Sequence, residues 1–551
     1  MNFALAIALV SAAAAPPKTP GADLVVINAK LPTADGDALV IRAGRVATVT
    51  SQAKLGTAVG SNTQVIDAGG RVLLPGFIDS HIHFMSGGIS EKRVRVHGAK
   101  NVEEIQARIK AYAAAHPEAQ WIQGRGFSYD LFAKLKPAFP TRQMLDAAVP
   151  DRPVFIRAYD GHTGWANTKA LELAGVTKDT KDPKDGKIIR EADGSPAGAL
   201  LEGAMDLMFE KVPPYSLAER IEGILEAQRL ALEAGLTAIN DFVADNETLD
   251  AYLALEKDGR LKVRVFFSPP IETPLDEAKA LRDRIAKESK RVKFGSLKGF
   301  VDGVVESNTA AFIAPYADDH KHKGEAHLKP ADLERLIVPA DKEGFVVSLH
   351  AIGDLAVRTS LDAYALAAQK NGTKDRRHRI EHIEVLDPKD AKRFKELGVI
   401  ASMQPYHAEP ADVPGKGVWE IKVGKARAPY IFPWNEIRSQ GGVVAFGSDW
   451  SVMSLDPLMG LAVATTRQNG HGLPREGWAV KQKLSFKEAV QAYTESAAYA
   501  LHAEGELGCL AAGCAADFVL LATKVDPEEP LSLYWGAVDA TYIDGKRAFG
   551  R

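Results

Sequence analysis

The chain is poor in cysteine: only Cys509 and Cys514 occur among its 551 residues. Two cysteines are too few for a disulfide-rich scaffold, and they cannot form a structural zinc site without histidine or carboxylate ligands. They lie close in sequence, so they either close a small loop in an oxidising compartment or remain two buried thiols. Any metal centre must therefore rely on histidine and acidic side chains.

The chain also lacks a strong net charge and a long apolar run. Its 68 lysines and arginines nearly balance 71 acidic residues, which gives a net charge of −3. Nucleic acid is not an expected partner, because proteins that bind it usually carry a clear basic excess. No run of about 20 apolar residues suggests a transmembrane helix, so stable membrane anchoring is not expected either. Small molecules are the expected partners, and the oligomeric state stays open, a homodimer included.

The first 15 residues, MNFALAIALVSAAAA, form an uncharged apolar start that leads into the proline-rich stretch PPKTPGA. An Ala-x-Ala run before such a stretch is typical of a secretory signal with its cleavage site, although no positive side chain precedes the apolar run. We predict that residues 1–22 are a signal peptide and linker, and that the mature protein is periplasmic. The alternative is the alanine-rich start of a cytoplasmic protein.

The two ends of the chain share a β-rich pattern. Runs rich in β-branched residues are LVVINAKL, ALVIRAGRVATVTS and TQVIDAGGRVLL near the N-terminus, and ADFVLLATKV and ATYIDGKRAF near the C-terminus. Turn residues such as Asp544-Gly545 separate strands of this kind. The pattern predicts that residues 23–74 and 501–551 form one composite β-sandwich domain.

Residues 75–500 alternate apolar strands with amphipathic helical patterns. The predicted strands are GFIDSHIHF, GLTAINDFV, VRVFFSP, SLKGFVDG, FVVSLHAIG, RIEHIEV, VIASMQPYH and VVAFGSDWS. Apolar strands separated by helices are typical of a parallel sheet covered on both faces, and eight such units indicate a (β/α)8 TIM-like barrel. The expected class is thus α/β, with residues 85–234 as a long insertion after the first barrel strand, over the barrel mouth.

Polar residues recur at the ends of these strands. Strand alternation places Asp79, His81 and His83 on one face, which suits Zn²⁺ but is a weak signal alone. His350, His382 and Asp449 also end apolar runs, at the edge where barrels place their chemistry. A lone histidine there is usually structural. Several such residues, buried without partners, would each cost free energy, and a shared metal satisfies all of them.

Lys298 lies in the predicted strand SLKGFVDG, whose alternation places Lys298, Phe300 and Asp302 on one face. Burial disfavours the ammonium form, so a lysine inside a barrel must lose its charge or find a partner. The simplest interpretation is an ion pair with Asp302 or Asp79.

Together these motifs resemble the amidohydrolase superfamily, and the finer pattern is similar to its N-substituted formamide deformylase-like (amidohydrolase 3) branch. The matching stretches cover nearly the whole chain after the linker: LLPGFIDSHIHF, GRGFSYDLF, PDRPVFIRAYDGHTGWANTKAL, KGFVDG, LHAIGD, RIEHIE, the QP at Gln404, GSDWS and GCLAAGCAADFVLL. One departure is GCLAAGCAADF, where the family often has serine and lysine at the cysteine positions. This departure affects the β domain rather than the site.

The resemblance implies one or two divalent metals per chain, Zn²⁺ or a similar ion. The ligands that it implies are His81, His83 and Asp449 for the more buried ion, His350 and His382 for the second, and a carboxylated Lys298 between them. Neither the carboxylation nor the number of metals follows from spacing alone.

The resemblance also implies a reaction: a metal-activated water cleaves a non-peptide C–N bond, in an amide or formamide. Asp449 would take the proton from the water and pass it to the leaving nitrogen. His162, in DGHTGW, is the implied substrate contact, and its alternative is an ordinary loop histidine. The same metal site also suits ester or lactone hydrolysis or deamination. A non-catalytic binding protein is disfavoured, because Asp449 and the HxH pair are present. The identity of the substrate stays open.

Overall fold

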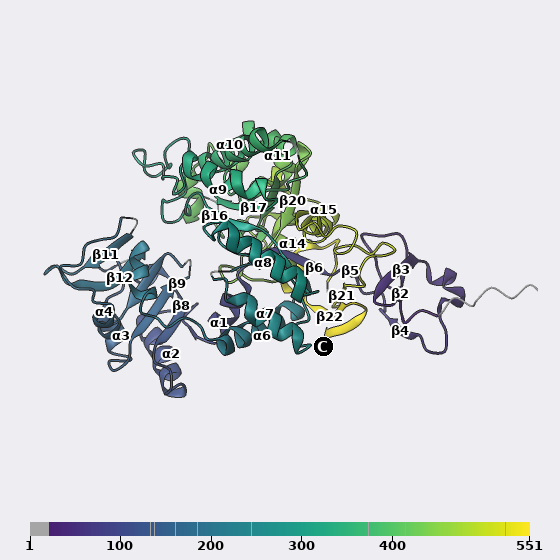
Figure 1. The fold of residues 1–551 in the computed structure, drawn as a ribbon, viewed down its shortest axis with the longest axis horizontal. Helices are drawn as coiled ribbons and strands as arrows, with labels where there is room; N and C mark the ends of the chain where they lie inside the picture. The colour runs from purple at the N-terminus through teal and green to yellow at the C-terminus, as the bar shows by residue number, and fades with distance from the viewer. Residues whose placement is uncertain are drawn as a thin grey trace, which may run out of the picture.

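The computed structural model describes residues 21–132, 134–136, 138–159, 161–184, 186–243, 245–372, 374–413, 415–523 and 525–551. They form an α/β protein in which central parallel sheets lie between a sheet from the predicted insertion and smaller sheets from the chain ends (Figure 1). The predicted signal segment lies almost entirely outside the described residues. Within the described part, no helix has the length and apolar character needed to cross a bilayer.

The centre consists of two parallel sheets, with strand orders β15-β14-β13-β6 and β16-β17-β18-β19-β20. Every strand predicted between residues 75 and 500 has a counterpart here, so these predictions are confirmed. The strands are β6 (Phe77–Ile82), β13 (Leu236–Phe242), β14 (Arg264–Ser268), β15 (Val292–Phe294), β16 (Leu297–Phe300), β17 (Val347–Ala351), β18 (Arg379–His382), β19 (Ile400–Met403) and β20 (Val443–Phe446). They form because short apolar runs, buried on both faces, suit parallel pairing.

The two central sheets meet on both sides. At one junction Lys298 forms a parallel bridge with Pro270, and its amide donates to the Pro269 carbonyl at 2.9 Å. At the other, β6 lies beside β20, where Ser80 Oγ donates to the Phe446 carbonyl at 2.8 Å. The described strands therefore pair as two sheets rather than as one continuous ladder.

Helices connect the central strands and cover them. They are α1 (Phe84–Glu91), α6 (Leu217–Glu233), α7 (Thr248–Lys257), α8 (Leu275–Glu288), α9 (Pro330–Lys342), α10 (Asp354–Asn371), α11 (Ala391–Leu397), α13 (Trp434–Ser439), α14 (Pro457–Thr466), α15 (Phe486–Ala492) and α16 (Glu495–Ala500). Helix α6 begins at a capping box, in which Ser216 and Glu219 satisfy each other's backbone amides. One apolar cluster, including Phe77, Ile239 and Leu349, fills the space between strands and helices.

Residues 94–202 contain a mixed sheet of order β11-β12-β10-β9-β8-β7, at the left of Figure 1. Its strands are β7 (Val94–Arg95), β8 (Ile122–Phe127), β9 (Val154–Ala158), β10 (Thr163–Ala166), β11 (Gly186–Arg190) and β12 (Pro196–Glu202); its helices are α2 (Val102–Ala115), α3 (Arg142–Asp146) and α4 (Thr168–Leu173). Phe127, Phe132 and Trp165 pack in a core of its own. We call this element the insertion sheet. The division of the chain into domains stays a prediction.

The two chain ends contribute two four-stranded sheets. One has β1 (Leu24–Ile27), β2 (Ala38–Arg42), β3 (Arg45–Thr50) and β4 (Gln64–Asp67); the other has β5 (Leu73–Pro75), β21 (Phe518–Leu521), β22 (Val538–Ile543) and β23 (Lys546–Gly550). Val26 and Leu39 of the first sheet share an apolar cluster with Phe518 and Tyr542 of the second. The two ends of the chain therefore have a common core.

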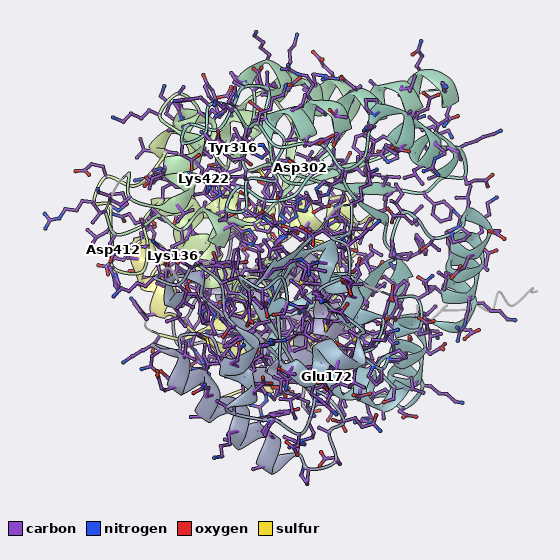
Figure 2. All side chains as sticks on the ribbon, turned by 90° about the vertical axis from the view of Figure 1, so that its left-hand side faces the viewer. Lys136, Glu172, Asp302, Tyr316, Asp412 and Lys422 are labelled. Carbon is purple, nitrogen blue, oxygen red and sulfur yellow. A yellow bond between two sulfur atoms is a disulfide. The ribbon has the colours of Figure 1, made fainter. Side chains whose placement is uncertain are left out.

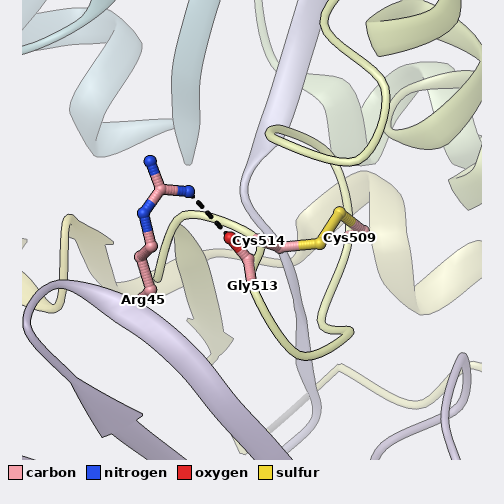
Figure 3. The surroundings of a disulfide bond; sticks show 4 residues. All are labelled: Arg45, Cys509, Gly513 and Cys514. Atoms are coloured by element: carbon pink, nitrogen blue, oxygen red, sulfur yellow. Dashed lines mark hydrogen bonds between the residues drawn. A yellow bond between two sulfur atoms is a disulfide. The ribbon is translucent and has the colours of Figure 1, made fainter.

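Cys509 and Cys514 are joined by a disulfide (Figure 3). The loop that they close lies against β3, where Arg45 Nη1 donates to the Gly513 carbonyl at 2.7 Å and the Val46 amide donates to the Cys514 carbonyl at 2.9 Å. Of the two states left open by the sequence, the structure has the bonded one. The disulfide loop thus holds the C-terminal segment against the N-terminal sheet.

Candidate metal centre

The residues predicted to bind metal gather at the carboxyl ends of the central strands. His81 lies on β6, His350 on β17 and His382 at the end of β18, while Asp449 follows β20. Carboxyl ends of parallel strands share one edge of a sheet, so residues far apart in sequence meet there.

His81, His382 and Asp449 form the tightest group. One potential ligand atom from each lies within 4.8 Å of the others, and all three side chains are buried. Within the described part of the chain, His81 Nε2, His382 Nδ1 and Asp449 Oδ1 have no hydrogen-bond partner. Buried polar atoms rarely lack partners, and imidazole nitrogens with a carboxylate oxygen are the donors that zinc prefers. These residues fit a divalent cation.

His83 and His350 lie beside this group rather than inside it. His83 lies one residue past the end of β6, so the alternation expected from the strand does not set its direction. Its Nε2 is 3.2 Å from Asp449 Oδ1. The ring of His350 lies 4.4 Å from the ring of His382, and its Nε2 is 3.1 Å from the Gly303 carbonyl oxygen.

Burial favours the neutral form of three histidines, His81, His350 and His382. Burial and, to a smaller extent, the charge of Lys298 lower the pKa of His350 to about 3. Burial likewise lowers the pKa of His81, and that of His382 well below the ordinary histidine value. Neutral imidazole is the form that coordinates a metal, so these side chains are prepared to be ligands.

Asp449 is kept ionised. Burial alone would raise the pKa of its carboxyl group, but the adjacent His81 and His83 hold it well below the ordinary range. His81 Nε2 lies 3.4 Å from Asp449 Oδ1. The site therefore pairs a buried carboxylate with buried neutral imidazoles.

Lys298 is buried on β16 and makes no ion pair with any described carboxylate, so the pair expected with Asp302 or Asp79 is not formed. Its Nζ lies 4.5 Å from the Phe242 ring centre and 4.7 Å from that of Phe300. Burial lowers the pKa of Lys298 to about 8. Near neutral pH the side chain therefore stays mostly protonated, but its neutral-amine fraction is much larger than that of an exposed lysine.

Asp302 and Asp79 organise the backbone around the site instead. Asp302, labelled in Figure 2 together with Tyr316, accepts hydrogen bonds from the amides of Ala311 (2.9 Å), Ile352 (3.0 Å) and Gly353 (2.9 Å). Asp79 accepts from the Ser448 amide at 2.9 Å. The two carboxylates thus fix the segments next to His350 and Asp449.

Glu381 is a site residue that sequence reasoning missed. Its Oε2 lies 2.8 Å from His81 Nδ1, and Arg379 Nε donates to its Oε1 at 2.9 Å. Burial would raise the pKa of Glu381, but the charge of Arg379 and the contact with His81 lower it to about 2. The signal lay in RIEHIE, where an acid precedes the histidine.

His407, in the 3-10 turn Pro405–Ala408, is a second residue beside the site that does not belong to the predicted ligand set. Its Nε2 lies 3.8 Å from Asp449 Oδ2, and its Nδ1 lies 3.8 Å from Glu384 Oε1. Glu384 Oε2 accepts from Trp419 Nε1 at 2.9 Å. The only sequence signal for His407 was its place after the strand that ends near Gln404.

His162, the predicted substrate contact, lies in the loop before β10. Its Nδ1 is 2.8 Å from Glu202 Oε2. It lines a cavity of about 620 Å³ that also borders His83 and Ser451. The structure therefore places His162 on the cavity wall, while other residues surround Asp449.

Comparison with known proteins agrees with this geometry. The profile of the Amidohydrolase family matches residues 64–549. The chain is 34% identical to Protein LONG AFTER FAR-RED 3 of Arabidopsis thaliana, over 97% of this chain and 93% of the relative. It is 26% identical to the N-substituted formamide deformylase of Arthrobacter pascens, over 96% and 98%. The crystal structure of an uncharacterized metal-dependent hydrolase from Pyrococcus horikoshii matches with a TM-score of 0.73 and 25% identity, over 92% of this chain and 98% of that one.

The family profile covers most of the chain, and the motifs that carry the candidate metal centre lie within the matched range. On these grounds the chain belongs to the amidohydrolase family.

Proposed function

We propose that this protein is a metal-dependent hydrolase that cleaves a non-peptide C–N bond in an amide or formamide. The observation that carries the proposal is the buried group of His81, His382 and Asp449, each of which has a side-chain atom without a hydrogen-bond partner among the described residues. The Arthrobacter pascens relative is named a formamide deformylase, and the Pyrococcus horikoshii structure is called a metal-dependent hydrolase. Both names support this reaction class.

The proposal includes a barrel. The two central sheets meet at Lys298 and Pro270 on one side and approach each other at β6 and β20 on the other. Only two residues separate the end of β15 from the start of β16. The two short strands together therefore take the place of one barrel strand. This arrangement supports a (β/α)8 barrel that has its active site at the carboxyl ends of its strands.

His81, His382 and Asp449 would hold a divalent ion, zinc or a similar metal, with His83 beside it. His350 and a carboxylated Lys298 would serve a second ion. The neutral amine of Lys298 would form an N–C bond with CO₂ and release a proton, and the lowered pKa of Lys298 favours that reactive form. When bound, the metal supplies Lewis acidity, which acidifies a water molecule and polarises a substrate carbonyl.

The side chains of the site then divide the remaining work. Asp449 accepts the proton of the attacking water at a carboxylate oxygen and returns it to the leaving nitrogen. Glu381 keeps the proton of His81 on Nδ1, and thereby keeps Nε2 free to accept. His162 contacts the substrate from the cavity wall.

Metal analysis and a substrate panel test the proposal together. Purified protein should contain at least one divalent metal per chain by plasma mass spectrometry. Chelation should abolish hydrolysis of a formamide or amide, and added zinc should restore it. The panel should also contain matched esters, lactones and amino-heterocycles. Full activity in metal-free protein would contradict the proposed metal dependence. Hydrolysis of esters without any hydrolysis of amides or formamides would contradict the proposed cleavage of a C–N bond.

Export is a separate part of the proposal. The disulfide Cys509–Cys514 is consistent with an oxidising compartment, where such bonds persist. Protein recovered from its native host should begin near residues 15–17, after the alanine run. An N-terminus at Met1 in mature protein contradicts export.

A further inference from the structure

The cavity beside the candidate metal centre is rich in arginine. His83 and Ser451 border it on one side, and strands β8 and β9 of the insertion sheet border it on another. Its described lining contains Arg93, Arg125, Arg157 and Arg220, whereas Asp245 is the one acidic residue there. The wall nearest the insertion sheet therefore carries an excess of positive charge.

Arg220 does not contribute to this excess. Its Nη1 donates to both carboxylate oxygens of Asp245, at 2.6 and 2.7 Å. The pair is neutral overall, and it uses the only carboxylate among the described lining residues. Arg93 and Arg157 form no ion pair with any described carboxylate.

Arg157 has no hydrogen-bond or ion-pair partner within the described part of the chain. It lies on β9, in register with Arg125 on the neighbouring strand β8. Its guanidinium carbon lies 6.0 Å from the centre of the Phe209 ring. Burial lowers the pKa of Arg157, and the nearby charge of Arg93 also lowers it. Like charges on adjacent strands repel, and a desolvated cation without a partner costs free energy.

Arg93 and Arg125 differ in what they can offer a ligand. Arg93 donates to Gln123 and, at 3.4 Å, to the Tyr215 hydroxyl, so its hydrogen bonds to described residues go to neutral groups only. A guanidinium has five N–H donors, so both Arg93 and Arg157 keep donors for a ligand. Arg125 Nη1 donates to Ser451 Oγ at 2.9 Å, which ties the insertion sheet to the segment that follows Asp449.

We propose that Arg157 and Arg93 bind an anionic group of the substrate, so that this enzyme acts on amides that carry a carboxylate or a phosphate. Arginine suits either anion, because its planar fork donates two parallel hydrogen bonds. Phe155, Phe209 and Val212 line the same cavity and would contact an apolar part of the substrate. An N-acylated amino acid has this combination of groups. The inference rests on the proposed hydrolysis of a C–N bond.

Two matched substrate pairs test the inference in the metal-loaded, full-length enzyme. N-formylphenylalanine and N-formylphenethylamine differ only by a carboxylate; N-formylphosphoethanolamine and N-formylethanolamine differ only by a phosphate. We expect kcat/KM to be at least about tenfold higher for the anionic member of one pair, since hydrogen bonds to charged groups are strong. The pair that shows this preference identifies the anion.

Arg157→Gln should lower that preference, the ratio of the two kcat/KM values, by about tenfold or more. Arg157→Lys keeps the positive charge but not the two parallel N–H donors, so it should retain part of the preference. The lysine variant also keeps the inference testable if Arg157→Gln fails to fold. Arg335→Gln is the matched control, because Arg335 is exposed on α9 and lies 3.6 Å from Asp332. The control should keep the wild-type ratio.

Equal kcat/KM within both pairs, in an enzyme that hydrolyses them, overturns anion recognition while amide hydrolysis stands. An unchanged ratio in Arg157→Gln overturns the assignment to Arg157. If no pair is hydrolysed, the proposed reaction is wrong for formamides, and calorimetry with 3-phenylpropanoate and with inorganic phosphate still decides the inference. Binding that weakens about tenfold in Arg157→Gln supports it, and binding that is absent or independent of Arg157 overturns it.

Discussion

Glu381 and His81 form a contact of 2.8 Å between Oε2 and Nδ1, and both side chains are completely buried. The carboxylate is itself held by Arg379 at 2.9 Å, so its charge is compensated inside the protein. This contact favours the proton of His81 on Nδ1, which leaves Nε2, 3.4 Å from Asp449 Oδ1, as the nitrogen that can bind a cation between the two side chains. A carboxylate behind a histidine ligand commonly orients the ring and raises its basicity.

Glu381→Gln should therefore weaken metal binding. The amide keeps the shape of the side chain but leaves Arg379 without its counter-charge and His81 without an anionic partner. We expect metal affinity to fall by about 10–100-fold, measured by competition with a chromophoric chelator. Glu396→Gln, on the exposed side of α11, is the control and should bind metal as the wild type does. Wild-type affinity in Glu381→Gln would rule out the orienting role.

The position of Glu381 shows what the sequence could and could not predict. The strands could be predicted, since a short apolar run between helical patterns has few other folds available. His81, His350, His382 and Asp449 could be predicted because each ends such a run. The contact between Glu381 and His81 joins residues 300 positions apart, and only the relative placement of β6 and β18 creates it.

The predicted and the observed placement of other site residues also differ where a residue lies outside a regular strand. Strand alternation predicts directions within a strand, but His83 lies beyond β6 and Asp302 lies beyond β16. Asp302 therefore bonds to backbone amides rather than to Lys298. His407 lies in a turn after β19, where no periodic pattern indicates the direction of a side chain.

A buried carboxylate away from the site predicts how the stability of the fold depends on pH. Asp341, near the end of α9, accepts from Arg376 Nε at 2.5 Å and from Asn371 Nδ2 at 2.7 Å, and lies 3.3 Å from His378 Nε2. Burial alone would raise the pKa of Asp341, but these neighbours hold it well below the ordinary value. A carboxyl group whose pKa is lowered in the folded state stabilises the fold fully above its unfolded pKa of about 3.9. This stabilisation is lost as the pH falls towards the folded pKa.

Asp341→Asn should accordingly lower the free energy of unfolding at pH 7 by roughly 3–5 kcal/mol, as the loss of one partner from a buried pair typically does. Urea unfolding should show a constant difference from the wild type between about pH 7 and 5, and a smaller one below about pH 4. Asp332→Asn, on the exposed part of the same helix, should stay within about 0.5 kcal/mol of the wild type. A difference that grows on acidification would contradict the assignment.

The disulfide loop predicts a modest gain in stability. A short closed loop restricts the unfolded chain little, so removal of the Cys509–Cys514 bond should cost about 2 kcal/mol. The double variant Cys509→Ser, Cys514→Ser and the wild type in dithiothreitol should unfold at similar urea concentrations, both below the oxidised wild type. Dithiothreitol should leave the double variant unchanged. If it shifts the double variant as well, the effect does not come from this bond.

Asp449 has two roles that different substitutions separate. Asp449→Asn keeps the shape and one oxygen ligand but cannot take up the proton of the attacking water. General acid–base catalysis typically contributes about 10²–10⁴-fold, so kcat should fall at least that far while the fold and at least one bound metal persist. His81→Ala should instead lose metal together with rate, since His81 Nε2 is part of the tight group. Circular dichroism and metal analysis of each variant, beside its kcat, distinguish the two losses. Near-normal kcat with full metal occupancy in Asp449→Asn would defeat the assignment and direct the search for the proton acceptor to His162 and to His407, whose Nε2 lies 3.8 Å from Asp449 Oδ2.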